Sequence, residues 1–260
     1  LPAVDGSALT GIADGVTKSA SDPTGSTNPA GGIGTIWLNT TSGEMFSLTD
    51  ATAGANIWTN TGDGIGGVGF LATGGTMSTL NSYTYHAFTS SGTFTINLPV
   101  SVDYIIVGGG GSGRYKTDYR GGTGGAVLTS TSLALSAASY SIVVGAGGTG
   151  WTSNLPGVAS TAFSLTAAGG TSVGGHTGVG ANGTTVTRFS QFGVSGVFGG
   201  GGGGGNTTVS AGGTGGGGTG GTSPGGNGIV NTGGGGGGGD SAQNASGSGG
   251  SGIIIVRFLT

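Results

Sequence analysis

The residues with the clearest binding chemistry lie in one short segment, 113–121, between two glycine runs. Within it are three of the six basic residues of the chain, two tyrosines and an aspartate. Arginine presents a planar fork of N–H donors that fits carboxylate, phosphate or sugar hydroxyl groups, and tyrosine offers flat contact area at low entropic cost. We therefore expect a recognition loop here, with a solvated loop that binds nothing as the alternative. The candidate residues are Arg114, Tyr115, Lys116, Asp118, Tyr119 and Arg120.

A second candidate contact follows another glycine run and comprises Trp151 and Asn154. An indole ring has a large apolar face that can stack on a sugar ring. Packing of Trp151 beneath the glycine runs is the alternative. Three further turns, at 206–211, 222–231 and 240–248, are candidates with weaker chemistry.

Catalytic chemistry is poorly represented in the sequence. Of the two histidines, His86 falls in an alternating strand, where we expect it to face solvent, and His176 falls in a glycine-rich turn. Asp103 and Asp118 are the only acids between residues 64 and 239, which leaves few candidates for the paired carboxylates of a glycosidase. The absence of cysteine excludes disulfides and thiolate metal sites. We therefore expect no catalytic residue, no metal ion and no cofactor.

The composition excludes several other classes of protein. Glycine accounts for 69 of the 260 residues and charged residues for 6 %, against usual shares of about 7 % and 25 %. Glycine does not recur at every third position, which excludes collagen, and no apolar run approaches the length of a membrane span. Residues 1–65 hold six acids and one base, whereas residues 66–260 hold three acids and five bases. This balance is too weakly basic for nucleic-acid binding.

The segments that must position these loops begin with residues 1–69. Turn formers throughout residues 1–34 indicate an extended connector or stalk. Residues 35–69 are predicted to form a small β module, in which Trp37 and Trp58 supply the apolar anchors. Its predicted parts are a hairpin of strands 35–39 and 44–48, a third strand at 55–60 and a linker over 62–69. Because so small a sheet is marginal in water, we expect the module to need a partner.

Residues 70–260 are predicted to form a β-sandwich tip domain that includes the glycine runs. The continuous apolar run at 102–107 is typical of a central sandwich strand. The last apolar run, 252–258, would aggregate as an exposed edge, so we expect it to pair inside the sheet. Other predicted strands lie at 83–89, 93–98, 126–130, 139–144 and 162–166.

The glycine runs between these strands allow two interpretations. Glycine-rich segments are usually flexible linkers. However, runs such as 199–205, 212–221 and 233–239 lie before an apolar closing strand to which the chain must return. Glycine in the polyproline II conformation, with three residues per turn, can pack closely on all sides and pair its N–H and C=O groups with neighbours. We therefore expect packed polyglycine II helices on a jelly-roll-like sandwich, in a mainly β chain with essentially no α-helix.

Three parts of the sequence, in this order, resemble distal tail-fibre proteins of tailed phages. Residues 1–12 (LPAVDGSALTGI) are similar to a repeat near fibre ends, and residues 34–60 are similar to a small hairpin module of the same fibres. The run YIIVGGGG at 104–111 and the ending GSGIIIVR at 250–257 resemble a glycine-rich domain common at fibre C-termini. The chain is also similar to T-even-type adhesins and, more distantly, to the glycine-rich ectodomain region of certain receptor tyrosine kinases.

This resemblance implies a homotrimer at the distal tail fibre of a virion, continuous with an upstream fibre segment. Its partner would be a cell-surface glycan or outer-membrane protein of the host, with no nucleic-acid partner and no membrane insertion. We accordingly expect a non-catalytic receptor-binding tip. A structural fibre or filament subunit without receptor binding is the first alternative, and a polysaccharide-depolymerising spike is the second.

Overall fold

The computed structural model describes residues 16–65, 71–116, 118–151, 153–172, 177–205, 207–221, 224–240 and 245–259. The chain divides into two compact units, residues 1–70 and residues 71–260, called unit 1 and unit 2 here. His176 and residues 1–15 of the predicted connector lie outside the described residues.

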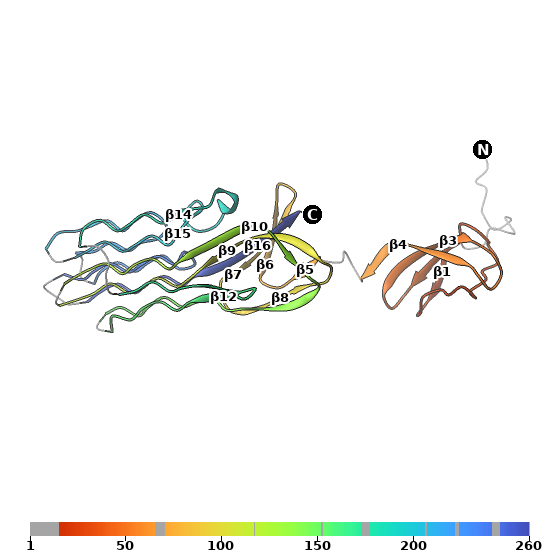
Figure 1. The fold of residues 1–260 in the computed structure, drawn as a ribbon, viewed down its shortest axis with the longest axis horizontal. Helices are drawn as coiled ribbons and strands as arrows, with labels where there is room; N and C mark the ends of the chain where they lie inside the picture. The colour runs from red at the N-terminus through yellow and green to blue at the C-terminus, as the bar shows by residue number, and fades with distance from the viewer. Residues whose placement is uncertain are drawn as a thin grey trace, which may run out of the picture. The chain divides into compact units, whose positions relative to one another are not determined.

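Unit 1 contains one four-stranded sheet in the order β1-β2-β3-β4 (Figure 1). Its strands are β1 (Val16–Ser19), β2 (Ile36–Asn39), β3 (Gly43–Asp50) and β4 (Ile57–Ile65). The hairpin of β2 and β3 confirms the sequence prediction. Two features were not predicted: β1 pairs in parallel with β2 although it lies in the predicted connector, and β4 continues to Ile65 through the predicted linker. β1 has only four residues and lies among turn formers, so the alternation of its side chains is too short a pattern to recognise in the sequence.

The apolar interior of unit 1 lies on one face of this sheet. Trp37 and Trp58 meet there edge to face, with ring centroids 5.7 Å apart, and Leu48 is 1 % exposed between the strands. The segment before β2 covers this face, since Trp37 Nε1 donates to the Ser21 carbonyl oxygen at 2.9 Å. The two tryptophans are thus the anchors that the sequence indicated.

Unit 2 contains a β-sandwich with β16 (Ile253–Leu259) in the middle of its larger sheet (Figure 1). The five-stranded sheet has the order β10-β9-β16-β7-β6, and the three-stranded sheet has the order β11-β8-β5. The closing strand therefore pairs inside the sheet, as predicted. The other strands of these sheets are β5 (Ala72–Thr73), β6 (Thr76–Leu80), β7 (Tyr83–Phe88), β8 (Gly92–Ile96), β9 (Val100–Val107), β10 (Val127–Leu135) and β11 (Ala138–Ile142).

The larger sheet is buried on both faces, which explains the continuous apolar run of β9. Ile254 and Val256 of β16 face the core between the two sheets, together with Phe94 of β8. Ile255 faces the opposite side, where Phe189 and Phe198 cover it. This cover comes from the 3₁₀ helix η2 (Thr187–Phe189) and the short strands β14 (Thr184–Thr185) and β15 (Val197–Phe198).

His86 on β7 is buried, so the expectation that it faces solvent is wrong. Its side chain is 1 % exposed and packs against the rings of Phe94 and Phe258, with centroids 5.2 and 5.7 Å away. Nδ1 donates to the Gly74 carbonyl oxygen at 2.7 Å. Burial lowers the pKa of His86, while this hydrogen bond acts in the opposite direction. Burial therefore favours the neutral imidazole in the folded protein.

The segment 162–166, predicted as a single strand, is a hairpin turn. Strands β12 (Ser160–Ala162) and β13 (Leu165–Ala167) pair in antiparallel fashion around Phe163 and Ser164, whose φ angles are 55° and 61°. Both turn residues therefore occupy the left-handed region, which two-residue hairpin turns require and which usually selects Asn or Gly. Without these residue types, the sequence carried no turn signal.

The glycine-rich segments of unit 2 form packed polyglycine II helices, as predicted. Along residues 108–114 the N–H groups of Gly108, Gly111 and Arg114 donate to one neighbouring segment, at Ala126, Thr123 and Arg120. The intervening N–H groups donate to two other neighbours: 109 and 112 to segment 153–159, and 110 and 113 to segment 245–252. A hydrogen-bond partner that repeats every third residue is the mark of a helix with three residues per turn.

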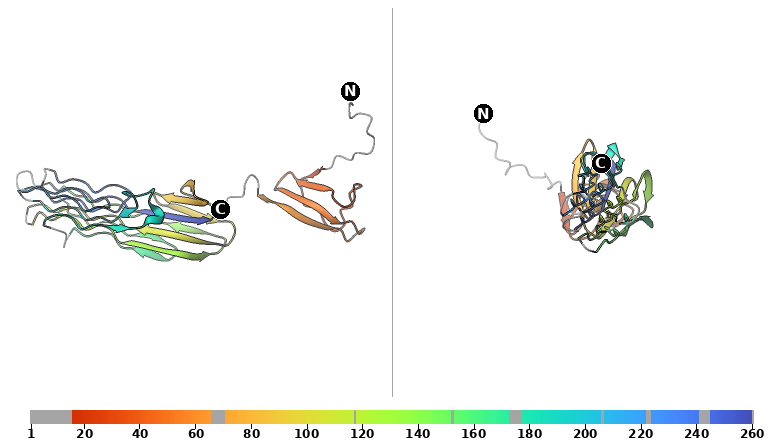
Figure 2. Two further views of the ribbon diagram at one scale, coloured as in Figure 1. Left: turned by 90° about the horizontal axis from the view of Figure 1, so that it is seen from above. Right: turned by 90° about the vertical axis from the view of Figure 1, so that its left-hand side faces the viewer.

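These segments run side by side from the strands to the far end of unit 2 (Figures 1 and 2). We call them the glycine rods. They comprise residues 108–114, 119–126, 145–151, 153–159, 168–172, 177–183, 199–205, 209–214, 217–221, 224–229, 233–240 and 245–252.

The rod 233–240 lies at the centre of this array, and its residues 233–239 are buried. Its backbone pairs with six surrounding rods. Its N–H groups donate to rods 108–114, 199–205, 224–229 and 245–252, and its carbonyl groups accept from rods 119–126, 217–221 and 245–252. A Cβ at Gly236 would overlap the carbonyl of Gly247, so only glycine fits this position. The rods thus form a rigid base on which the turns between them are held.

Candidate receptor-binding site

The six candidate residues of the segment 113–121 lie where two rods meet at the far end of unit 2. Rod 108–114 runs out to this turn and rod 119–126 returns from it. The ends of the two rods that flank the turn are its stems, and they are joined by a hydrogen bond from the Arg114 N–H to the Arg120 carbonyl oxygen at 2.7 Å. Neighbouring rods hold both stems, because Gly239 N–H donates to the Arg114 carbonyl oxygen and Gly205 N–H to that of Tyr119. The turn is therefore fixed at its base.

Asp118 organises the basic side chains of this turn. One carboxylate oxygen, Oδ2, lies 3.0 Å from Arg114 Nη1 and 3.4 Å from Arg120 Nε. All three side chains are partly exposed, so these ion pairs contribute little to stability. Their main effect is to orient two guanidinium groups around a single negative charge.

Lys116 extends beyond this ion-pair cluster. It is exposed, and its ammonium group lies 5.4 Å from the centre of the Tyr115 ring, within range of a cation–π interaction. Tyr115 and Tyr119 are half-buried. The turn therefore offers one exposed cation, two tyrosines and two oriented arginines to a ligand.

Trp151 and Asn154 lie at the corresponding turn between rods 145–151 and 153–159. The backbone of Trp151 forms a bridge to Ser246, with N–H···O distances of 2.8 and 3.3 Å, and Ser172 Oγ donates to the Asn154 carbonyl oxygen at 2.7 Å. The Trp151 side chain is 62 % exposed, so it does not pack beneath the rods. The alternative interpretation of Trp151 is thereby contradicted.

The packing of the rods brings both candidate turns to the same end of unit 2. Near the first turn, Ser112 N–H donates to the Leu155 carbonyl oxygen at 3.1 Å, beside the second turn. Gly113 N–H donates to Gly247 at 2.9 Å, and Gly247 follows the Ser246 that pairs with Trp151. We call the eight candidate residues at this end the tip cluster.

Four residues of the tip cluster have a backbone conformation that L-residues rarely adopt. The φ angles of Lys116, Tyr119, Trp151 and Asn154 are 68°, 47°, 63° and 49°. A residue other than glycine in this left-handed region costs of order 1–3 kcal/mol, and such strain concentrates at functional sites. In a chain so rich in glycine, these side chains occupy positions where glycine would be less strained.

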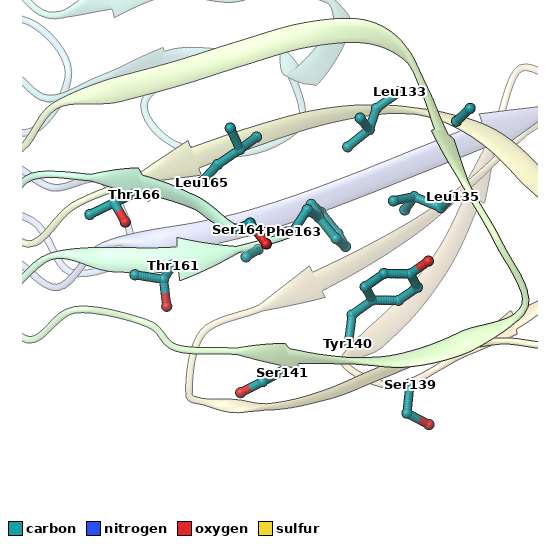
Figure 3. Close-up of a pocket in the computed structure, with 12 residues that line it drawn as sticks. Leu133, Leu135, Ser139, Tyr140, Ser141, Thr161, Phe163, Ser164, Leu165 and Thr166 are labelled. Atoms are coloured by element: carbon teal, nitrogen blue, oxygen red, sulfur yellow. The ribbon is translucent and has the colours of Figure 1, made fainter.

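A groove of about 610 Å³ lies on the side of the sandwich, away from the tip cluster, and the sequence analysis did not identify it (Figure 3). Phe163, at the turn between β12 and β13, points toward Tyr140 of β11, with ring centroids 5.5 Å apart. Leu133, Leu135 and Leu165 also line it, and no lining residue is charged. These residues match the ordinary apolar pattern of strands, so no sequence signal distinguished them.

Charged and metal-binding chemistry is sparse in the part of the chain that the structure describes. No group of three or more His, Cys, Asp or Glu side chains comes together there. Asp103, one of the few acids of unit 2, pairs with Arg257 at 2.9 Å. Among the described residues, no helix has the length and apolar character needed to cross a membrane.

Fold and tip together define a β-sandwich that supports a bundle of polyglycine II helices ending in a group of turns. The chain belongs to the glycine-rich domain family, whose model matches residues 89–259. The match begins after β7 and continues to the end of β16, so it includes all the glycine rods and the tip cluster. No curated protein matches the chain.

Proposed function

We propose that this chain is the non-catalytic receptor-binding tip of a phage tail fibre. In this proposal it sits at the distal tail fibre of the virion as a homotrimer, joined to an upstream fibre segment. The tip cluster binds a glycan or an outer-membrane protein on the bacterial surface, without nucleic-acid binding or membrane insertion. The observation that carries the proposal is the strained tip cluster, with Trp151 62 % exposed, held at the end of a fully packed array of glycine rods.

The physical support is preorganisation. Binding costs about 0.5–1.5 kcal/mol for each flexible side chain that becomes ordered, and a rigid base lowers the further cost of ordering the backbone. The stems of the 113–121 turn are held by hydrogen bonds from two neighbouring rods. Aromatic and arginine side chains on such a base are the types that dominate binding energy at interfaces.

A structural fibre or filament subunit is the second candidate, and one observation favours it. Arg114 and Arg120 both interact with Asp118, so two of the three basic side chains of the turn have a partner within the turn itself. In that case the ion pairs would serve only to close the end of the rods. The two candidates differ in whether the tip cluster contributes to binding of cells.

The test is binding of the fluorescently labelled full chain to a panel of bacterial strains. We expect saturable binding to a subset of strains, weakened at least about tenfold by Trp151→Ala and by Arg114→Ala, as for residues at the centre of an interface. Lys18→Ala is the matched control, because it removes one exposed positive charge from β1 in unit 1. Alanine retains the Cβ at Trp151, so the φ strain there is unchanged.

Each outcome separates the candidates. Binding that survives both tip substitutions would contradict the tip assignment. Absence of binding to every strain would favour the structural subunit. Release of soluble sugars from the polysaccharide of a bound strain would contradict the non-catalytic part of the proposal.

A further inference from the structure

Donors for a further acidic group remain in the tip cluster after the ion pairs around Asp118 have formed. Lys116 is exposed, and no described carboxylate lies within ion-pair distance of its ammonium group. Arg114 donates to Asp118 through Nη1 only, so among the described residues the two N–H groups at its Nη2 have no partner. The Arg114 side chain is 27 % exposed, so a ligand can reach part of it.

The balance of charge at this end of unit 2 is positive as well. The turn 113–121 contributes three bases, against two acids at this end, Asp118 and Asp240. Asp240 belongs to this end because the N–H of the preceding Gly239 donates to the Arg114 carbonyl oxygen at 3.0 Å. One excess positive charge favours an anionic ligand, but it does not decide what kind of molecule carries the negative charge.

The second observation is an exposed aromatic ring on the next rod. Trp151 ends a rod that lies beside the rod of Arg114, since Gly148 N–H donates to the Gly110 carbonyl oxygen at 2.8 Å. The Trp151 side chain is 62 % exposed. A large flat apolar surface is therefore available to a ligand next to the cationic turn.

A third rod, 245–252, shows that the ring and the cations start at nearly the same height. Gly113 N–H donates to Gly247 at 2.9 Å, and Trp151 N–H donates to Ser246 at 2.8 Å. This rod runs back toward β16, so Ser246 lies one residue, or about 3.1 Å, farther out than Gly247. Trp151 is therefore level with the residue that follows Gly113, the first arginine of the turn.

This juxtaposition matches a sugar with an acidic substituent. The C–H groups on one face of a sugar ring pack against an indole, and a carboxylate or phosphate accepts strong hydrogen bonds from ammonium and guanidinium groups. A sugar ring is rigid and holds both features in one unit. An acidic protein loop would have to order several flexible side chains to present them together, which costs free energy.

We propose that the tip cluster binds an acidic sugar of the host surface, one that carries a carboxylate or a phosphate group. The sugar ring stacks on Trp151, its acidic group accepts from Lys116 and Arg114, and Asp118 keeps the guanidinium groups oriented. The inference rests on the proposed function and selects the glycan from the two classes of receptor named there.

The experiment is direct binding of the full chain to purified polysaccharides, measured alongside binding to bacterial cells. Polygalacturonate supplies carboxylates, a phosphomannan supplies phosphates, and dextran is the neutral control. We expect saturable binding to at least one acidic polymer and none to dextran, and the polymer that binds identifies the acidic group. Binding should weaken as NaCl is raised from about 0.05 M to about 0.5 M, because salt screens the charges.

Two matched pairs of variants locate the binding on the chain. Lys116→Gln removes the charge that has no ion-pair partner and should raise the dissociation constant about tenfold, whereas Lys18→Gln makes the same change at an exposed position of β1 and should have no effect. Trp151→Phe and Trp151→Leu both keep a Cβ at this strained position, but only phenylalanine keeps a flat ring. Trp151→Phe should therefore retain more of the binding than Trp151→Leu.

The outcomes separate this inference from the proposed function. Absence of binding to both acidic polymers, or equal effects of Lys116→Gln and Lys18→Gln, overturns the inference. Binding to cells that is lost when their surface proteins are digested also overturns it, because the receptor is then a protein, but it leaves receptor binding by the tip standing. Binding to an acidic polymer that depends on Lys116, without binding to any bacterial strain, supports the inference and contradicts the proposed function.

Discussion

At the scale of single residues, glycine in the rods is required by close contact between backbones. A Cβ at Gly236 would overlap the Gly247 carbonyl, and the same happens at Gly110 against Gly234. The carbonyls they would meet belong to other rods and cannot move without breaking hydrogen bonds. Glycine, which loses the most conformational entropy on folding, is therefore used where no other residue fits.

The first prediction compares two glycines with different surroundings. Gly236→Ala should lower the free energy of unfolding of unit 2 by about 3 kcal/mol or more, because the added methyl group overpacks a rigid array. Gly178→Ala is the control, since among the described residues, its chain neighbours aside, no atom lies within 4 Å of the added Cβ. It should be neutral or stabilise by about 0.4–1 kcal/mol, through a less flexible unfolded chain. Urea unfolding followed by circular dichroism measures both, and equal effects would contradict close packing of the rods.

At the scale of elements, sequence patterns predicted the strands whose apolar residues decide their position. The apolar run of β16 required a place inside the sheet, and that of β9 required cover on both faces. Alternation along β7 was visible too, but it gives only which side chains share a face, not whether that face is buried. His86 was therefore misjudged, because β8 and the rest of the smaller sheet cover its side.

The burial of His86 predicts a pH dependence of stability. Its pKa is lowered in the folded protein and returns to its ordinary value of about 6.5 on unfolding. Protons therefore bind preferentially to the unfolded chain, so this contribution to stability is complete above pH 6.5 and is lost as the pH falls below it. Between pH 7.5 and 5.5 we therefore expect the free energy of unfolding to fall because of this residue.

Urea midpoints of the wild type and of His86→Leu at these two pH values measure the effect. The variant loses the hydrogen bond to Gly74 and should be less stable at pH 7.5. It should, however, show a smaller change between the two pH values than the wild type does. An identical pH dependence in both proteins would mean that His86 does not titrate on unfolding.

At the scale of the whole molecule, the position of the glycine runs before an apolar closing strand predicted that the rods pack, but not which rods become neighbours. Polyglycine backbones are alike, so they carry little information about register. In the structure, polar side chains near the rod ends supply it: Asn182 Oδ1 accepts from Thr214 N–H at 3.1 Å, and Asn227 Oδ1 from Ser248 N–H at 2.8 Å. The sequence showed these asparagines, but their partners lie 32 and 21 residues away and no spacing rule connects them. The tip cluster could be proposed from residue types, whereas its assembly at one end depended on this register.

The packing of the rods as one array predicts their hydrogen-exchange behaviour. The N–H groups of residues 235–239 donate in turn to rods 199–205, 108–114 and 224–229, so opening one amide requires separation of several rods. We expect the amides of residues 235–239 to exchange only through global unfolding of unit 2, and therefore among the slowest in the chain. Exposed backbone at the tip, such as Lys116, should exchange many orders of magnitude faster.

Exchange measured by mass spectrometry on wild type and Gly236→Ala should show a parallel loss of protection in rods 108–114 and 199–205, because both accept hydrogen bonds from the central rod. Protection lost only next to residue 236 would mean that the rods open independently and that the tip cluster lacks a rigid base.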